Sequence, residues 1–217
     1  MSSTQETLKF LSNATILFEG DSITDCDRNY KSIGSLGQGY VMMISSWFSA
    51  MYPEKNVRFV NRGRKGDRVR ELKARFQKDL FESKPDIVSI LIGINDVLRK
   101  DIWNRPTALE SFEKDYRQIL EQIRSKKNAK PVMIQPFLLD SAERYVYLKK
   151  ELDVLLKVMG KLSEEFESVL IPLDSIFSEA STKRASYFWA SDGVHPTLPG
   201  HALIALSWLR IVLNVLP

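Results

Sequence analysis

The 217-residue chain has little cysteine and little histidine: one cysteine, Cys26, and two histidines. A single thiol excludes an intrachain disulfide, and we expect Cys26 to be a small buried residue rather than a reactive one. No run of about 18 apolar residues is present, and the first residues lack the basic and apolar regions of a secretory signal. The sequence therefore predicts a cytoplasmic protein with no membrane span.

Motifs that mark several common enzyme classes are also missing from the sequence. There is no Gly-x-Ser-x-Gly elbow of the α/β-hydrolases, no phosphate-binding P-loop, and no Gly-x-Gly-x-x-Gly after a strand. His-Glu-x-x-His and Cys-x-x-Cys do not occur either, which argues against a zinc site. We therefore expect a function that needs neither a metal nor an organic cofactor.

The chain carries only a small excess of positive charge. The formal net charge of +4, from 31 Lys and Arg against 27 Asp and Glu, does not indicate a nucleic-acid partner. Basic residues nevertheless gather in segment 58–75, where they are Arg58, Arg62, Arg64, Lys65, Arg68, Arg70, Lys73 and Arg75. The ordinary interpretation is a solvated helix face, and the alternative is a positive rim that attracts an anionic or polar substrate.

Short apolar runs rich in β-branched residues alternate with longer segments of helical periodicity. The runs are continuous, as expected for strands buried on both faces, and lie at 15–18, 57–60, 87–92, 132–134 and 169–173. Apolar residues recur at helical steps over 69–80, 112–123 and 152–162, and a last helix is expected over 199–213. The pattern predicts an α/β fold, a three-layer α/β/α sandwich with about five parallel strands, in a single domain over 1–217.

Two segments could carry a serine nucleophile and its base. Ser22, in the segment 20–24, directly follows the first expected strand, where its hydroxyl would lie above the sheet; the alternative is an ordinary turn or helix cap. Near the other end, Asp192 and His195 are three residues apart, so the carboxylate can reach the imidazole and fix its tautomer. A lone histidine more often makes a structural hydrogen bond, and this is the expected role of His201, which falls inside the last expected helix.

Two further segments could stabilise a developing oxyanion. Asn95 follows the most apolar expected strand, and its amide offers N–H donors; the alternative is a common Asn-Asp turn. The segment 61–66 follows the second strand and contains Gly63 and Gly66, either of which could turn a backbone N–H into the site. Each segment alone is weak support for an active site. Together, however, the three segments with Ser22, Gly66 and Asn95 each follow an expected strand, and the fourth, with His195, lies in the C-terminal loop.

In this combination the sequence resembles the SGNH (GDSL-like) hydrolase superfamily, whose four lettered positions are matched by Ser22, Gly66, Asn95 and His195. Longer stretches are similar to its acetylxylan esterase branch: GDSITDC at 20–26, GYV at 39–41, YPE at 52–54, VRELKARF at 69–76, KPDIVSILIGINDVLR at 84–99 and DGVHPTLPGH at 192–201. Between about residues 103 and 190 the sequence matches this branch only in general character, with no matching motif.

The resemblance implies a flavodoxin-like fold, Asp192 as the acid of the triad, and an oxyanion hole made by the N–H groups of Ser22 and Gly66 with the Asn95 side chain. One departure is charge around Gly66, where Arg64 and Lys65 precede it and Asp67 and Arg68 follow it, in place of the small or hydroxylated residues frequent in the family. This departure bears on the shape and charge of the acyl pocket.

These observations predict a serine carboxylic-ester hydrolase that removes O-acetyl groups from xylo-oligosaccharides or related sugars. The substrate follows from the resemblance alone. The alternatives are a general carboxylesterase, lysophospholipase or thioesterase, and a non-catalytic binding module on the same fold. Asp21, Trp103 and Trp189 lie near the motifs and are expected substrate contacts, although a core or lid role is equally open for the two tryptophans. A homo-oligomer is left open.

Overall fold

The computed structural model describes residues 11–103, 109–126, 129–139 and 143–215, and within these ranges it describes the side chains of all but 99–103 and 143–146. The described residues form a single parallel sheet with the strand order β2-β1-β3-β4-β5. The strands are β1 (Thr15–Gly20), β2 (Arg58–Asn61), β3 (Ile87–Leu91), β4 (Lys130–Ile134) and β5 (Val169–Ile171). The predicted five-stranded parallel sheet is confirmed.

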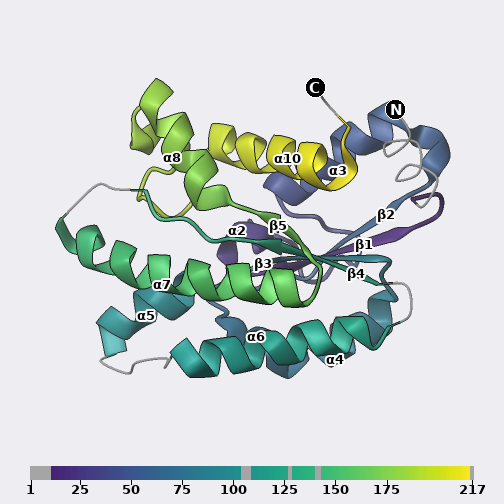
Figure 1. Ribbon diagram of the computed structural model, residues 1–217. Coiled ribbons are helices and arrows are strands. Elements are labelled where there is room, and N and C mark those ends of the chain that lie inside the picture. The colour runs from purple at the N-terminus through teal and green to yellow at the C-terminus, as the bar shows by residue number, and fades with distance from the viewer. Residues whose placement is uncertain (1–10, 104–108, 127–128, 140–142, 216–217) are drawn as a thin grey trace.

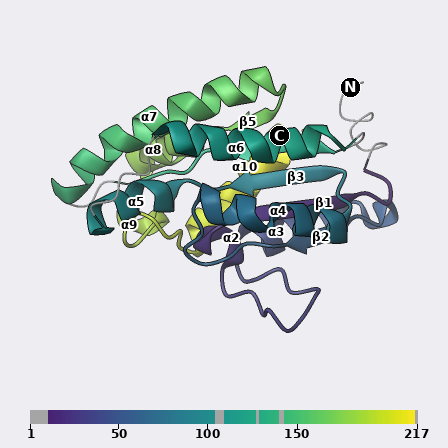
Figure 2. The ribbon, with the colours of Figure 1, turned by 90° about the horizontal axis from the view of Figure 1, so that it is seen from below.

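Helices cover both faces of the sheet (Figure 1). One face carries α3 (Tyr40–Met51), α8 (Leu173–Lys183) and α10 (Leu198–Leu213). The other carries α4 (Val69–Ser83), α6 (Leu109–Arg124) and α7 (Glu143–Glu165), with α4 and α6 packed side by side (Figure 2). Shorter elements are α2 (Ser22–Asp25), the 3₁₀ turn Pro53–Lys55, α5 (Ile94–Trp103) and α9 (Ser186–Trp189). The three-layer sandwich is therefore as predicted.

The helices with regular apolar spacing lie where the sequence predicts them. In α4 the side chains of Val69, Leu72, Phe76 and Leu80 are all buried against the sheet. Helix α10 begins after Thr197, whose Oγ1 accepts the N–H of Gly200 at 3.3 Å, as an N-cap does. Helices α3, α5 and α8 were not among the predicted elements. None of the helices in the described ranges is long and apolar enough to cross a membrane.

The two central strands are buried along their whole length, and one of their residues is an acid. Every residue of β1 and β3 is buried, which accounts for the continuous apolar runs in the sequence. Glu19 of β1 is equally buried, although its side chain is ionisable. Burial raises the pKa of Glu19 to about 8, although the Arg75 guanidinium beside it lowers that pKa.

The basic segment 58–75 is mostly engaged in ion pairs, so the prediction of a solvated helix face holds for only part of it. Four of its basic residues, Arg58, Arg64, Lys65 and Arg70, are exposed, and 63% of the Arg70 side chain is accessible. Arg75 is only 10% exposed and reaches three carboxylates, and Arg62 lies 3.7 Å from both Asp79 and Glu82. Lysines of the segment also pair with acids. The charge of this segment therefore serves mainly to bind the protein's own acids.

Candidate active site

Ser22 begins α2, directly beyond the carboxyl end of β1. The residue that caps this helix is Asp21, whose Oδ1 accepts the N–H of Ile23 at 2.9 Å. A Cβ atom on Gly20 would lie 2.3 Å from the carbonyl oxygen of Leu91, so only glycine fits this tight turn between strand and helix. Because Asp21 does the capping, the Ser22 hydroxyl is left for another partner.

Ser22, His195 and Asp192 form a hydrogen-bonded chain. His195 Nδ1 lies 2.7 Å from Asp192 Oδ2, and His195 Nε2 lies 3.1 Å from Ser22 Oγ. When the ring proton is on Nδ1, the Nδ1–H group donates a hydrogen bond to Asp192. Nε2 then carries a lone pair, so it accepts a hydrogen bond from the Ser22 hydroxyl. In this arrangement His195 is placed to accept the serine proton as the serine oxygen attacks a carbonyl carbon.

The Asp192 carboxylate is oriented by the backbone of its own loop. Its Oδ1 accepts the N–H of Val194 at 2.9 Å and the N–H of His195 at 2.7 Å. Partial burial opposes ionisation, but these hydrogen bonds and the His195 ring lower the pKa of Asp192 below its usual value. A carboxylate that stays ionised holds the ring in one tautomer and stabilises an imidazolium. About half of each side chain is exposed, so substrate can reach the pair from solvent.

Asn95 lies on the same edge of the sheet, in the first turn of α5. Its Nδ2 donates to the carbonyl oxygen of Asp67 at 3.0 Å. A side-chain amide has two hydrogens on nitrogen, so one such bond orients the group and leaves a second N–H for an oxyanion. The structure thus joins Asn95 to the loop that contains Gly66.

The two glycines of that loop have different roles. The N–H of Gly63 donates to Asn61 Oδ1 at 2.9 Å, and a Cβ atom on Gly63 would lie 2.4 Å from the backbone nitrogen of Asp25. Gly63 is therefore needed for close packing, and its N–H is already used. Gly66 has a φ of 78°, a left-handed conformation that favours glycine. The engaged N–H of Gly63 argues against Gly63 as the oxyanion glycine.

Comparison with known proteins shows which family the chain belongs to. A model of the GDSL-like lipase/acylhydrolase family matches residues 18–203. The chain belongs to this family. The family predicted from the motifs is confirmed, and the protein is a serine carboxylic-ester hydrolase.

Individual known proteins and solved structures are similar to almost the whole chain. The acetylxylan esterase of Geobacillus stearothermophilus is 34% identical over 212 residues, which are 94% of this chain and 95% of the relative. Its crystal structure matches with a TM-score of 0.85 and covers 92% of this chain and 94% of that one. An α/β hydrolase enzyme from the metagenome of Lake Arreo, Spain, is 30% identical, with a TM-score of 0.85 and coverage of 92% and 95%. Three solved variants of the Geobacillus esterase, with a serine, an aspartate or a histidine replaced by alanine, are each described as a catalytic mutant.

The three expected substrate contacts are not equivalent in this GDSL-family structure. Asp21 is 1% exposed and caps α2, so its carboxyl group is withdrawn from any substrate, and the expectation for it is corrected. The Trp189 indole N–H donates to the carbonyl oxygens of Ala180 and Arg184, both at 3.1 Å, which ties α9 to the end of α8. Only the ring face of Trp189 remains for a substrate. Trp103 ends α5, and its side chain lies outside the described residues.

Burial makes Asp21 a pH-sensitive group. Burial raises its pKa to about 7, against a smaller lowering by the Ile23 N–H and by His195. Because the folded-state pKa lies above the unfolded value, protonated Asp21 stabilises the fold fully below about pH 4, and this contribution is lost as pH rises through about 7. Asp21→Asn removes this titration. We expect the gain in unfolding free energy between pH 8 and pH 5, measured by urea denaturation, to be about 2 kcal/mol smaller in the variant.

A matched control for this prediction is Asp27→Asn. Asp27 is exposed and paired with Lys65, and this pairing lowers its pKa, so it stays ionised between pH 5 and pH 8. Its replacement should leave the difference between the two pH values unchanged. An Asp21→Asn protein with the same pH dependence as the unmodified protein would contradict the assignment of a raised pKa.

The second histidine makes structural hydrogen bonds near the site. His201 is buried, its Nδ1 accepts the N–H of Tyr40 at 3.2 Å, and its Nε2 lies 3.4 Å from Cys26 Sγ. Burial lowers the pKa of His201 to about 4, so the ring is neutral near pH 7. Burial also raises the pKa of the Cys26 thiol, which is half-buried rather than fully buried as expected. Neither group is therefore poised for acid–base or thiolate chemistry.

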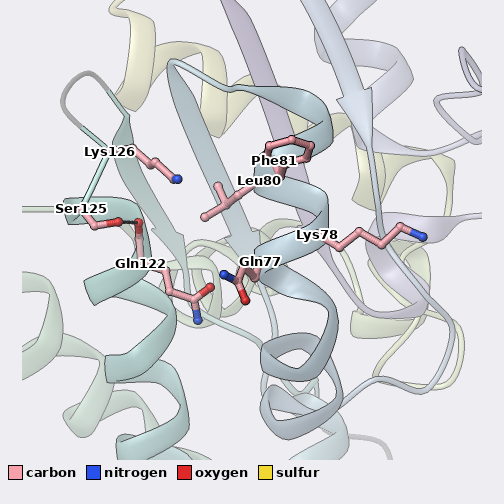
Figure 3. A pocket seen from close by; sticks show the side chains of 7 residues that line it. All are labelled: Gln77, Lys78, Leu80, Phe81, Gln122, Ser125 and Lys126. Atoms are coloured by element: carbon pink, nitrogen blue, oxygen red, sulfur yellow. Dashed lines mark hydrogen bonds between the residues drawn. The ribbon is translucent and has the colours of Figure 1, made fainter.

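A hollow of about 550 Å³ lies between the C-terminal ends of α4 and α6 (Figure 3). These helix ends lead into β3 and towards β4, so the hollow is at the amino end of the strands, opposite the triad. Its lining includes Ser125, but that hydroxyl donates to the carbonyl oxygen of Gln122. Neither histidine is among the residues that line it, so the hollow offers no base for a serine nucleophile.

Proposed function

We propose that the enzyme removes O-acetyl groups from xylo-oligosaccharides or related sugars, with Ser22, His195 and Asp192 as its catalytic triad. The observation that carries the chemistry is the continuous hydrogen-bonded chain from Ser22 Oγ through His195 to Asp192. The substrate class rests on the similarity to an acetylxylan esterase over almost the whole chain.

The first half of the reaction forms an acyl-enzyme. Ser22 Oγ attacks the ester carbonyl carbon while His195 Nε2 takes the hydroxyl proton, and Asp192 stabilises the imidazolium. The carbonyl oxygen becomes an oxyanion, which accepts hydrogen bonds from the N–H groups of Ser22 and Gly66 and from the Asn95 amide. The tetrahedral intermediate collapses as His195 gives its proton to the leaving sugar hydroxyl.

The second half repeats these steps with water. His195 removes a proton from water as its oxygen attacks the acetyl carbonyl, and the same three donors hold the oxyanion. Collapse expels Ser22 Oγ, which recovers its proton from His195, and acetate leaves. Each proton that His195 takes is returned within the same half-reaction, so the enzyme ends each cycle in its starting state.

The acyl-chain preference tests the substrate class. Each methylene of a longer acyl chain contributes only about 0.8 kcal/mol, and only if it meets an apolar wall. The loop around Gly66 is charged instead, with an exposed Arg64 before it and Lys65 held by Asp27 at 2.6 Å. We expect kcat/KM to fall from acetate to butyrate esters and to be negligible for palmitate. A peracetylated xyloside should be hydrolysed at least as well as a simple aryl acetate, because the sugar adds binding energy.

The experiment is a kcat/KM series over p-nitrophenyl acetate, butyrate, octanoate and palmitate, with acetate release from the xyloside measured separately. The Ser22→Ala protein sets the background for each substrate. A maximum at octanoate or longer would overturn the sugar-acetate assignment and favour a lipase or thioesterase. Hydrolysis of the aryl acetate without hydrolysis of the xyloside would also overturn that assignment and would indicate a general carboxylesterase.

A further inference from the structure

Arg75 joins the strand that precedes the nucleophile to the loop that contains Gly66. From α4, its Nη1 donates to Glu19 Oε2 at 2.5 Å, and its Nη2 lies 3.4 Å from the carbonyl oxygen of Gly20. Its Nε donates to Asp67 Oδ2 at 2.9 Å. One guanidinium therefore contacts the end of β1, two residues before Ser22, and the residue that directly follows Gly66.

The loop needs such a restraint because glycine has no side chain to hold it. Gly66 has a left-handed φ, and a glycine gains more conformational freedom than any other residue when its neighbours are loose. Asp67 is fixed at two points instead: its carboxylate by Arg75, and its carbonyl oxygen by Asn95 Nδ2 at 3.0 Å. Asp67 is thus held relative to both β1 and α5, and with it the adjoining Gly66, whose N–H is the proposed oxyanion donor.

The contact is largely withdrawn from solvent. The Arg75 side chain is 10% exposed, and that of Asp67 is 13% exposed. Burial opposes ionisation of Arg75, but Glu19, Asp67 and Asp79 together raise its pKa above the usual value. A planar guanidinium with several fixed donors can hold several carboxylates at set distances, which a flexible ammonium cannot do.

We propose that Arg75 is a positioning residue that acts through the carboxylate of Asp67 and so holds the neighbouring Gly66, whose N–H donates to the oxyanion, in place. The inference rests on the proposed oxyanion hole. Displacing one preorganised donor slows the step in which charge develops, and hardly changes binding of the uncharged ester. Loss of the restraint should therefore lower kcat and leave KM nearly unchanged.

Two alanine variants separate positioning from simple stability. Asp67 and Asp79 both pair with Arg75, but Asp79 lies on α4 itself, one turn from Arg75, at 2.6 Å. Its other ion pair, at 3.7 Å, is with Arg62 at the start of the loop, four residues before Gly66. Asp67→Ala should lower kcat for p-nitrophenyl acetate about tenfold, with KM changed less than twofold. Asp79→Ala removes the same charge and should leave kcat within about twofold, even if it lowers Tm as much.

Coupling to Asn95 completes the test. If the Asp67 carboxylate and Asn95 hold the same stretch of the loop, their effects on kcat will not multiply. In an Asn95→Ala background, Asp67→Ala should lower kcat by less than about threefold further. Arg75→Gln should reproduce the Asp67→Ala loss, and if that variant does not fold, the comparison of Asp67 with Asp79 still decides the question.

Four results would overturn the proposal. Equal losses of kcat in Asp67→Ala and Asp79→Ala would show that Arg75 acts on the fold as a whole. Full multiplication of the Asp67→Ala and Asn95→Ala effects would show that the two residues act separately. If Asn95→Ala lowers kcat but Asp67→Ala does not, the oxyanion hole stands and the role of Arg75 is wrong; if neither lowers kcat, both fail.

Discussion

Replacing Ser22 with alanine is expected to lower kcat by about 10⁵–10⁶-fold, because members of a catalytic triad act as a unit and no other nucleophile is activated in their place. The variant should fold normally, since the Ser22 hydroxyl donates to His195 and does not cap α2, a role that belongs to Asp21. His195→Ala should be about as inactive. Asp192→Asn should retain more activity, because the base survives with a poorly oriented ring. Turnover of p-nitrophenyl acetate measures all three.

A matched control for the nucleophile is Ser125→Ala. Ser125 also has its hydroxyl in a hydrogen bond near a hollow, but at the amino end of the sheet and with the carbonyl oxygen of Gln122 as its partner. Its replacement should leave kcat unchanged. Near-native turnover by Ser22→Ala, with an unchanged circular dichroism spectrum, would refute the assignment of Ser22 as the nucleophile.

Asn95→Ala is expected to lower kcat by about 10²–10³-fold with a much smaller change in KM. The amide is a donor that matters most when negative charge develops on the substrate oxygen. The same replacement also removes the bond from Nδ2 to the Asp67 carbonyl oxygen, so it loosens the loop with Gly66 as well. Steady-state kinetics on acetate esters separate the two constants.

The control for this variant is Asn56→Ala. Asn56 also donates through its side-chain amide, to Asn13 Oδ1 at 3.0 Å, but at the amino end of β2, far from the triad. Its loss should leave both constants unchanged. If Asn95→Ala raises KM and leaves kcat alone, Asn95 binds the substrate and takes no part in stabilising the oxyanion.

Much of the fold could be predicted from the sequence because its signals are local. The central strands are buried on both faces, so β1 and β3 appear as continuous apolar runs. The amphipathic helix α4 shows one buried stripe at regular spacing. Helix α3 was missed, although it buries Tyr40, Ile44 and Phe48, because exposed Trp47 and Met42 blur its apolar pattern.

The partners of the proposed triad could also be inferred from the sequence, for two different reasons. Asp192 and His195 are three residues apart, and a loop of that length brings the two side chains together by itself. Ser22 and His195 are 173 residues apart. The rule that ligands bind beyond the carboxyl ends of parallel strands places Ser22, but His195 follows α9 and not a strand, so its meeting with Ser22 was predicted by the resemblance to the family. The resemblance to the family then added the position of Gly66.

Other features depend on side-chain packing between distant elements, and only the tertiary structure decided them. Asp21 looked like a substrate contact, yet the tight turn after β1 turns its carboxylate inward to cap α2. Arg75 looked like part of a solvated basic face, yet it lies between β1 and the loop beside Gly66. Its bond to Glu19 joins residues 56 positions apart, and it exists because α4 packs over β1 and buries the two side chains together, where an acid needs a partner. Sequence spacing determined which residues could react, whereas the packing of α4 on the sheet determined how the loop beside them is held.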